Sequence, residues 1–229
     1  AQDAYALQSQ ERTARAQAAG LFDDEIVPVE AVKLVTNKTT KATHEERVTL
    51  TQDECNRPGT TLDGLAGLPA VRGADKTVTA GNASQLSDGA AALVVMSADA
   101  AQKRGLSPLG VLRSFAVAGV APEEMGIGPV KAIPRLLERA GLTMEAIDLW
   151  EINEAFASVA MRYMKDHGIS HEVTNVNGRS IAMGHPLGAT GAIIIGTLLD
   201  ELERQDKETG LATLCIASGM GAATIIERV

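Results

Sequence analysis

The sequence ATGAIIIGTLLDELERQ at residues 189–205 is followed by two short apolar segments, LATLCIA at residues 211–217 and AATIIER at residues 222–228. The first segment places its Ile and Leu residues on one side of a helix and its charged residues on the other, so it predicts an amphipathic helix. The two apolar segments flank SGMG at residues 218–221, a typical turn sequence, and predict a β-hairpin. A helix that packs on such strands indicates an α/β fold.

Segments further upstream fit the same fold class. Residues 129–140 and 154–167 carry apolar residues at helical spacing, and Gly141 and Gly168 follow them as typical C-terminal caps. A continuous apolar run at residues 91–96 precedes this alternation of helical and apolar segments. We therefore expect the α/β core to begin near that run.

The N-terminal third is less regular. Residues 3–19 contain strong helix formers without Pro or Gly, and Gly20 stands where a C-cap belongs, so they predict a helix. Residues 26–32 are rich in β-branched side chains but contain Pro28, which predicts an edge strand. Residues 33–76 are polar and interrupted by Gly and Pro, and we expect an excursion that is partly loop.

The composition is that of a globular chain, with 45% hydrophobic and 22% charged residues among 229. A formal net charge of -8 would repel a phosphate backbone, so nucleic acid is not an expected partner. The most apolar stretch, residues 188–199, is 12 residues long, well short of the roughly 20 needed to span a bilayer. We therefore expect no membrane span.

The cysteines and histidines argue against a metal site. Cys55 and Cys215 share no spacing motif, so they predict neither a disulfide framework nor a metal site, and they fit a reducing, cytoplasmic compartment. His44, His167 and His171 are not paired at the spacing of metal ligands. The GxxxxGK[ST] phosphate loop is absent, which argues against nucleotide hydrolysis.

Three short segments place reactive or polar side chains in tight settings. They are NEAFA at residues 153–157, GHPLGATG at residues 184–191 and CIASGMG at residues 215–221. His185 lies in a Gly/Pro turn directly before a helix, so its ring is presented by a loop beside backbone N–H groups that favour anions. It is a candidate base, and the alternative interpretation is a buried structural histidine held by the turn.

Cys215 and Asn153 also have two interpretations each. Cys215 ends an apolar strand, where a free cysteine is ordinarily a small core residue, but the adjoining glycine-rich turn would let a ligand approach the thiol. Asn153 opens the helix predicted at residues 154–167. Composition alone favours a helix cap there, because Asn commonly satisfies the first N–H groups of a helix.

Taken together and in this order, the three segments resemble the thiolase family. Residues 2–29, RPGTTL at residues 57–62 and TAGNASQLSDGAA at residues 79–91 are similar to thiolases as well, so the resemblance covers essentially the whole chain. It implies the layered αβαβα fold of the complete proteins, of which this chain corresponds to the later part.

The resemblance also implies a domain division. Residues 1–86 would be the second part of the coenzyme A-binding loop domain, and residues 87–229 the C-terminal core domain. The N-terminal domain, which carries the nucleophilic cysteine of the family, would be absent from this chain, because Cys55 lies in DECNRPG and Cys215 matches the second family cysteine. The isolated 229 residues are therefore expected to be inactive.

By resemblance, four residues would carry the chemistry. His185 would activate the nucleophile, which takes the acyl group from a 3-ketoacyl-CoA as a thioester. Cys215 would move a proton to and from the α-carbon of acetyl-CoA. Asn153 would hold a water in one oxyanion hole, and the backbone N–H of Ala217, where the family usually has Gly, would contribute to a second.

Substrate contacts follow from the same resemblance. Ala80 and Ser84 would line the pantetheine arm, and Phe156 would line the acyl and thioester region. Arg179 and Ser180 replace the small Gly-Ala pair that usually precedes the GHP turn, so substrate preference near His185 does not follow from the family.

The implied enzyme is an acetyl-CoA C-acyltransferase or acetyltransferase of fatty acid metabolism. It would have acyl-CoA and CoA as substrates, no separate cofactor, no metal, and a homodimeric or homotetrameric assembly with the missing half present. One alternative is a non-catalytic thiolase-like acyl-CoA-binding protein, in which we would expect decay at His185, Asn153 or Cys215. Another is a different condensing enzyme of the superfamily, which Cys215 disfavours because several of those enzymes carry His in this segment.

Overall fold

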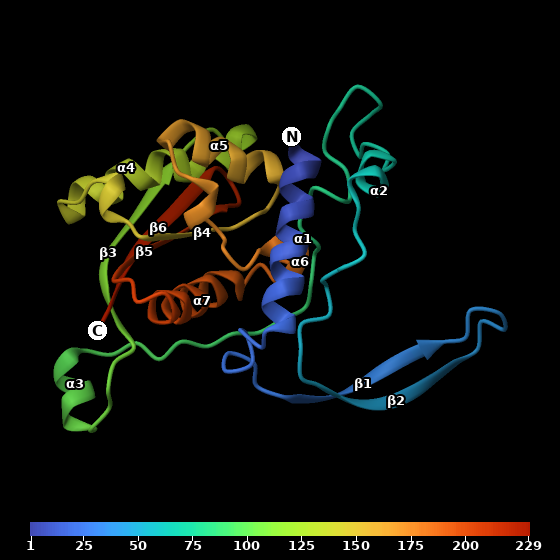
Figure 1. Ribbon diagram of the computed structural model, residues 1–229, viewed down its shortest axis with the longest axis horizontal. Helices are drawn as coiled ribbons and strands as arrows, with labels where there is room; N and C mark the ends of the chain where they lie inside the picture. The colour runs from blue at the N-terminus through green and yellow to red at the C-terminus, as the bar shows by residue number, and fades with distance from the viewer.

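A four-stranded mixed sheet is the centre of the computed structural model, which describes residues 1–229 (Figure 1). Its strand order is β3-β6-β5-β4, with β4 parallel to β5 and the other pairs antiparallel. The strands are β3 (Gly110–Gly119), β4 (Leu149–Ile152), β5 (Thr209–Ile216) and β6 (Met220–Arg228). The hairpin predicted at the end of the chain is confirmed, and Ser218 and Gly219 have the positive φ angles, 68° and 85°, of a tight turn.

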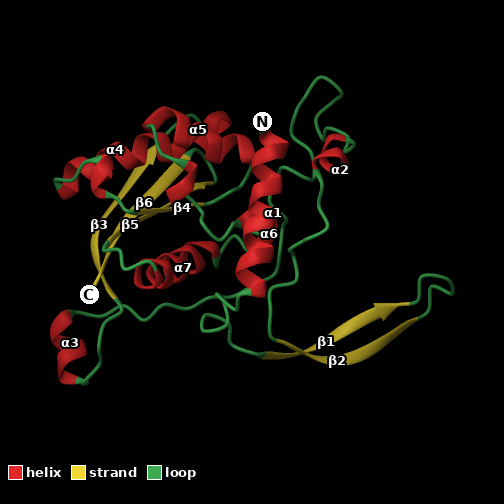
Figure 2. Ribbon diagram, in the orientation of Figure 1, coloured by secondary structure: helices red, strands yellow, loops and turns green.

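Helices cover both faces of this sheet (Figure 2). On one face, α4 (Gly128–Ala140) and α5 (Ala157–His167) share a core with the sheet, which includes Tyr163, Trp150 and Leu211. On the other face, α7 (Thr190–Arg204) packs its apolar side against β4 and β5. The three layers explain why the α7 sequence is amphipathic: one side meets the sheet and the other meets water.

The N-terminal helix α1 (Gln2–Ala18) packs against α5, α2 and α6 (Figure 1). The remaining short elements are α2 (Leu62–Ala66), α3 (Ala98–Lys103), η1 (Pro122–Ile127), η2 (Met144–Ala146), η3 (His171–Val173) and α6 (Ser180–Met183). None of the helices combines the length and the apolar character required to cross a lipid bilayer.

The predicted helices at residues 3–19, 129–140 and 189–205 are confirmed as α1, α4 and α7 with small shifts at their ends. The helix predicted at residues 154–167 begins only at Ala157. The preceding residues are extended and continue from β4 instead, because their backbone groups bond to the neighbouring segments at residues 82–84 and to β5.

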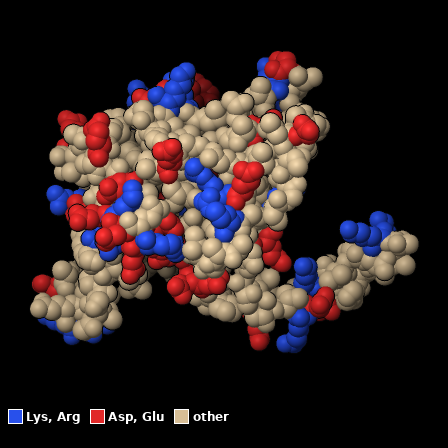
Figure 3. All heavy atoms as spheres, in the orientation of Figure 1, with Lys and Arg blue, Asp and Glu red and all other residues tan.

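A two-stranded hairpin projects away from the sheet, as Figures 1 and 3 show. Its strands are β1 (Val29–Thr36) and β2 (Thr43–Leu50), joined by a turn that carries lysines at the tip. The edge strand predicted at residues 26–32 is therefore present but begins after Pro28, and the interpretation of residues 33–76 as an excursion missed β2. Both strands are mostly exposed on both sides, so their sequences lack the alternation that reveals a half-buried strand.

The apolar run at residues 91–96 lies outside the core, contrary to prediction. It has no regular secondary structure, and the side chains of Val94 and Val95 are 85% and 76% exposed. An apolar run predicts burial only where another element is available to cover it. No strand within residues 1–229 pairs with this run, and the core sheet of the structure begins with β3 instead.

The start of α4 crosses the start of β6 at very close range. A Cβ built on Gly128 would lie 2.4 Å from the carbonyl oxygen of Met220, and one built on Gly221 would lie 2.1 Å from the carbonyl carbon of Gly128. Only glycines allow the two backbones to approach so closely. This crossing fixes α4 over the sheet.

We expect Gly128→Ala to lower the free energy of unfolding by about 1–3 kcal/mol or more, because backbone atoms must move to admit the new methyl group. Gly191→Ala is the matched control, since a Cβ at Gly191 meets nothing within 4 Å and Ala favours a helix. Urea unfolding of both variants in the complete protein measures the difference. Equal midpoints for the two variants would contradict the close crossing.

Candidate active site

Asn153 and His185, predicted from two separate motifs, lie side by side. Asn153 directly follows β4, and its backbone N–H donates to the Thr213 carbonyl of β5 at 2.9 Å. Its side-chain Nδ2 lies 3.2 Å from Nε2 of His185. The helix-cap interpretation of Asn153 is wrong, because α5 begins four residues later and has Phe156 at its N-cap position without a side-chain bond.

The turn that carries His185 is held by the segment at residues 85–87. The backbone N–H of His185 donates to the carbonyl of Gln85 at 2.8 Å, and Leu86 pairs with His185 in a short parallel bridge. On the other side, Nδ1 of His185 lies 2.7 Å from the hydroxyl of Thr190, the first residue of α7. The ring is therefore fixed through both its backbone and its Nδ1 atom.

His185 is 9% exposed, and this burial lowers the pKa of its imidazole below the ordinary value. The Thr190 hydroxyl donates to the Pro186 carbonyl at 3.0 Å, so it accepts from Nδ1–H of His185. The lone pair then sits on Nε2, which faces Asn153. A neutral ring whose lone pair lies on Nε2 is the form required of a general base.

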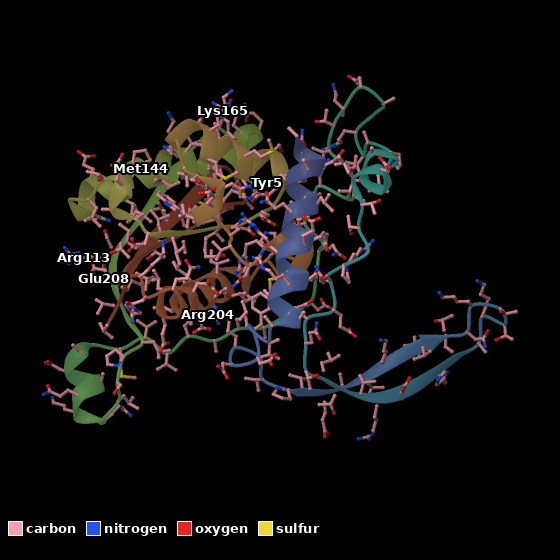
Figure 4. All side chains as sticks on the ribbon, viewed as in Figure 1. Tyr5, Arg113, Met144, Lys165, Arg204 and Glu208 are labelled. Carbon is pink, nitrogen blue, oxygen red and sulfur yellow. The ribbon has the colours of Figure 1, made fainter.

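Glu154 ties this site to the N-terminal helix. Its carboxylate is 1% exposed and accepts hydrogen bonds from Tyr5, Ser9, Asn175 and the backbone N–H of Ile181. Figure 4 shows Tyr5 on α1, on the side that faces the sheet. Burial raises the pKa of Glu154, while the bonds from Ser9, Asn175 and Tyr5 oppose that shift.

A buried ion pair lies beneath the same site. Arg179, which precedes α6, donates through Nε to the carboxylate of Glu151 on β4, and both side chains are 2% exposed. Burial raises the pKa of Glu151 to about 7, and the guanidinium of Arg179 acts in the opposite direction. The pair connects α6 to the strand that carries Asn153.

Cys215 lies on β5, two residues beyond the Thr213 carbonyl that receives the Asn153 N–H. Its side chain is buried, and burial raises the pKa of the thiol, whereas a hydrogen bond from Tyr163 opposes the rise. The thiol is therefore in its protonated form at neutral pH. No hydrogen bond joins Cys215 to His185 or Asn153, and Ala217 is exposed in the turn that follows β5.

The predicted substrate-binding residues fall into two groups. Ser84 donates from both its backbone N–H and its hydroxyl to the Ala155 carbonyl, each at 3.1 Å, and neighbouring Ala83 pairs with Phe156. Phe156 is 37% exposed. Ala80 instead lines a pocket of about 250 Å³ between α1, α2 and the segment around Arg57.

Several residues of the site were not singled out from the sequence. Glu154 and Thr190 lie inside the motifs quoted above, but the motifs do not predict which groups their side chains bond to. Gln85 and Arg57 lie in segments at residues 79–91 and 57–62, and Gln85 also donates to the Cys55 carbonyl at 3.0 Å. Spacing along the chain could not reveal Gln85 and Arg57, because the partners of these two residues are distant in sequence.

We expect His185 to titrate below the ordinary histidine pKa of about 6.5, because its charged form is desolvated. The unfolded chain then binds more protons than the folded one between the two pKa values. The contribution of His185 to the free energy of unfolding should therefore fall as the pH drops through this interval. An NMR titration of the imidazole Cε1–H, with the urea-unfolded protein as reference, measures both pKa values, and a folded value at or above the unfolded one would refute this account.

Comparison with known families and proteins shows the family of the chain. Residues 106–228 match the model of the thiolase C-terminal domain, and residues 1–99 match that of the thiolase N-terminal domain. The 3-ketoacyl-CoA thiolase of Bacillus subtilis (strain 168) is 50% identical over 226 residues, which are 99% of this chain and 58% of that protein. The peroxisomal 3-ketoacyl-CoA thiolase of Homo sapiens is 49% identical over 99% of this chain and 52% of its own length.

Solved structures show the same relationship. The acetyl-CoA acetyltransferase of Bacillus anthracis has a TM-score of 0.91 and 42% identity, covering 100% of this chain and 55% of that one. The human mitochondrial 3-ketoacyl-CoA thiolase in complex with CoA has a TM-score of 0.87 and 38% identity, with coverage of 100% and 54%. The chain spans about half the length of the curated relatives that it matches. Because the match to the C-terminal domain alone covers more than half of its residues, the chain belongs to the thiolase family.

Proposed function

We propose that the complete protein containing this chain transfers an acyl group between a 3-ketoacyl-CoA and CoA, by thiolytic cleavage or by the reverse condensation of acetyl-CoA. The observation that carries this proposal is the pair formed by Asn153 and His185, with Nε2 of a neutral histidine 3.2 Å from an amide donor. A base and an oxyanion donor at hydrogen-bond distance are what acyl transfer needs. The relatives are named as thiolases and an acetyltransferase.

In the proposed reaction, Nε2 of His185 takes the proton of a cysteine thiol that lies outside residues 1–229. The resulting thiolate attacks the 3-keto carbonyl, the bond between the α-carbon and that carbonyl breaks, and the acyl group stays on the cysteine as a thioester. The electron pair of the broken bond forms the enolate of acetyl-CoA, and the Cys215 S–H protonates its α-carbon. The raised pKa of Cys215 supports this role, because a protonated thiol is needed for that step.

Release of the product completes the proposed cycle. The thiol of CoA gives its proton to the Cys215 thiolate and attacks the thioester, which frees the acyl-CoA, and the departing cysteine thiolate regains its proton from His185. Asn153 would stabilise the enolate oxygen through a bound water, and the backbone N–H of Ala217 would face the oxygen of the thioester adduct. Ala217 supplies the same N–H as the family glycine.

Binding of the substrate is assigned to the segment around residues 80–84. Ser84 and Phe156 are brought together because residues 83 and 156 pair, so the pantetheine arm would lie along this junction. The pocket that contains Ala80 is also lined by Arg57, a side chain that suits a phosphate group of CoA. A local cation of this kind can attract CoA although the net charge of the chain is -8.

The proposal extends to assembly and compartment. We infer a homodimer or homotetramer in which the remainder of each thiolase supplies the nucleophile. A reducing, cytoplasm-like compartment is supported by Cys55 and Cys215, both of which are free thiols. Division of residues 1–86 and 87–229 between a loop domain and the C-terminal core domain belongs to the same proposal.

In the complete protein, His185→Ala should lower the rate of thiolysis about 10²–10⁴-fold, because the general base is removed. Alkylation of the nucleophilic cysteine by iodoacetamide should slow as well, since its thiolate is no longer favoured. His44→Ala, on the exposed hairpin, is the control and should change neither rate. If the rate of alkylation is unchanged in His185→Ala, this histidine does not activate the nucleophile.

Cys215→Ser should impair formation and cleavage of the carbon–carbon bond more than simple acylation of the enzyme, because a serine hydroxyl is a much weaker acid than a thiol. Overall thiolysis and the burst of acyl-enzyme from a plain acyl-CoA measure the two steps separately. Cys55→Ser is the matched control for loss of a thiol. Equal losses in both steps would contradict the role assigned to Cys215.

A further inference from the structure

The segment that leads from β2 to α2, residues 51–57, runs beside helix α1 without regular secondary structure (Figure 1). A backbone outside helices and sheets needs other hydrogen-bond partners. For Arg57, which the proposed function assigns to a phosphate group of CoA, the partner lies on α1: the backbone N–H of Arg57 donates to Oε1 of Gln10 at 2.8 Å. We propose that Gln10 is a positioning residue for CoA binding, which places Arg57 at the pocket by holding its backbone. This inference rests on the proposed function, because it needs CoA as the ligand of that pocket.

The orientation of the Gln10 amide is fixed by backbone groups that have a single role each. A backbone N–H only donates, so the atom that faces the N–H of Arg57 is the oxygen Oε1. A carbonyl only accepts, so the atom that faces the Ile181 carbonyl at 3.2 Å is the nitrogen Nε2. A turned amide would place oxygen against oxygen at Ile181 and two donors against each other at Arg57. Gln10 is 6% exposed, so such unpaired groups would be costly.

Asn56 strengthens the same contact from the segment. Its Nδ2 donates to the backbone carbonyl of Gln10 at 3.0 Å and to Oε1 of Gln10 at 3.1 Å. The backbone carbonyl of Arg57 accepts only from Thr60, in the turn that follows. Gln10 is therefore the residue that ties the backbone around Arg57 to the rest of the fold.

The guanidinium of Arg57 depends on this backbone bond, because little else holds the side chain. Arg57 is exposed, and its side chain donates only to Oε1 of Gln85 at 3.4 Å, which is longer than the usual range. Gln10, Arg57 and Ile181 all line the pocket to which CoA is assigned. Gln10 thus joins two parts of the pocket lining, the segment around Arg57 and helix α6.

Replacement of Gln10 by Met, an unbranched side chain without an amide, would leave the Arg57 N–H without its partner and free the backbone to move. In the complete protein, Gln10→Met should raise the Kd and the KM for CoA about tenfold, the size of the loss of one hydrogen bond to a charged group. The value of kcat, and the KM for pantetheine, which has no phosphate, should change by less than about twofold. Similar increases in the KM for CoA and for pantetheine would contradict a role through Arg57.

Gln8→Met is the matched control. Gln8 lies on the same helix and makes none of the bonds to residues 56, 57 and 181. The control should therefore bind CoA like the unsubstituted protein.

A double-mutant cycle with Arg57 separates positioning from a general loss of structure. Arg57→Ala removes the guanidinium but keeps the backbone N–H that Gln10 holds. If Gln10 acts through Arg57, the addition of Gln10→Met to Arg57→Ala should change the Kd for CoA by less than about twofold, measured by calorimetric titration. If Gln10→Met weakens CoA binding by the same factor with and without the Arg57 side chain, the inference is overturned.

Asn56→Ala provides a second variant, should Gln10→Met fail to fold. It removes both side-chain bonds to Gln10 from a half-buried position and should raise the Kd for CoA about threefold, again only when the Arg57 side chain is present. An unchanged Kd in the variants that fold would also overturn the inference. The titration needs no turnover, so a complete protein that binds CoA but lacks thiolysis would refute the proposed function, and the titrations would still decide the role of Gln10.

Discussion

One buried carboxylate, that of Glu154, holds together parts of the chain that are otherwise far apart. It accepts two bonds from α1, one from Asn175 and one from the start of α6. A hydrogen bond to a charged group contributes about 1.5–3 kcal/mol, so the four donors oppose the desolvation that raises the pKa of Glu154. Asn153 directly precedes Glu154 and His185 follows α6, so the base and its amide neighbour keep their places because this acid is satisfied.

Those parts of the fold that have a repeating apolar pattern could be predicted from the sequence. Helices α4 and α7 bury one side on the sheet, and the spacing of their apolar residues reflects it. The final hairpin forms two central strands of that sheet, and its continuous apolar runs reflect burial on both faces. The apolar pattern does not predict structure where the burial of an element depends on other segments of the protein. Strand β2 is exposed on both sides, and the apolar residues 91–96 have no strand to pair with, so the first was missed and the second was wrongly placed in the core.

The motifs identified the residues of the candidate site but not all of their partners. Asn153 looked like a helix cap because Asn before a helical pattern usually is one, whereas it directly follows β4 and its side chain lies beside His185. The resemblance to thiolases assigned it a role that composition disfavoured. Ser180 and Glu151 act through contacts 27 and 28 residues away, and no local spacing records such pairs.

The bonds between α1 and the site also set an order of events during synthesis. Tyr5, Ser9 and Gln10 meet partners that lie 145 to 171 residues later in the chain. At translation rates of about 5–20 residues per second, the helix waits roughly 7–34 s before those partners exist. A helix of 17 residues is only marginally stable alone in water. Helix α1 therefore leaves the ribosome well before the partners to which it docks, and until they follow its polar groups are open to chaperones and to solvent.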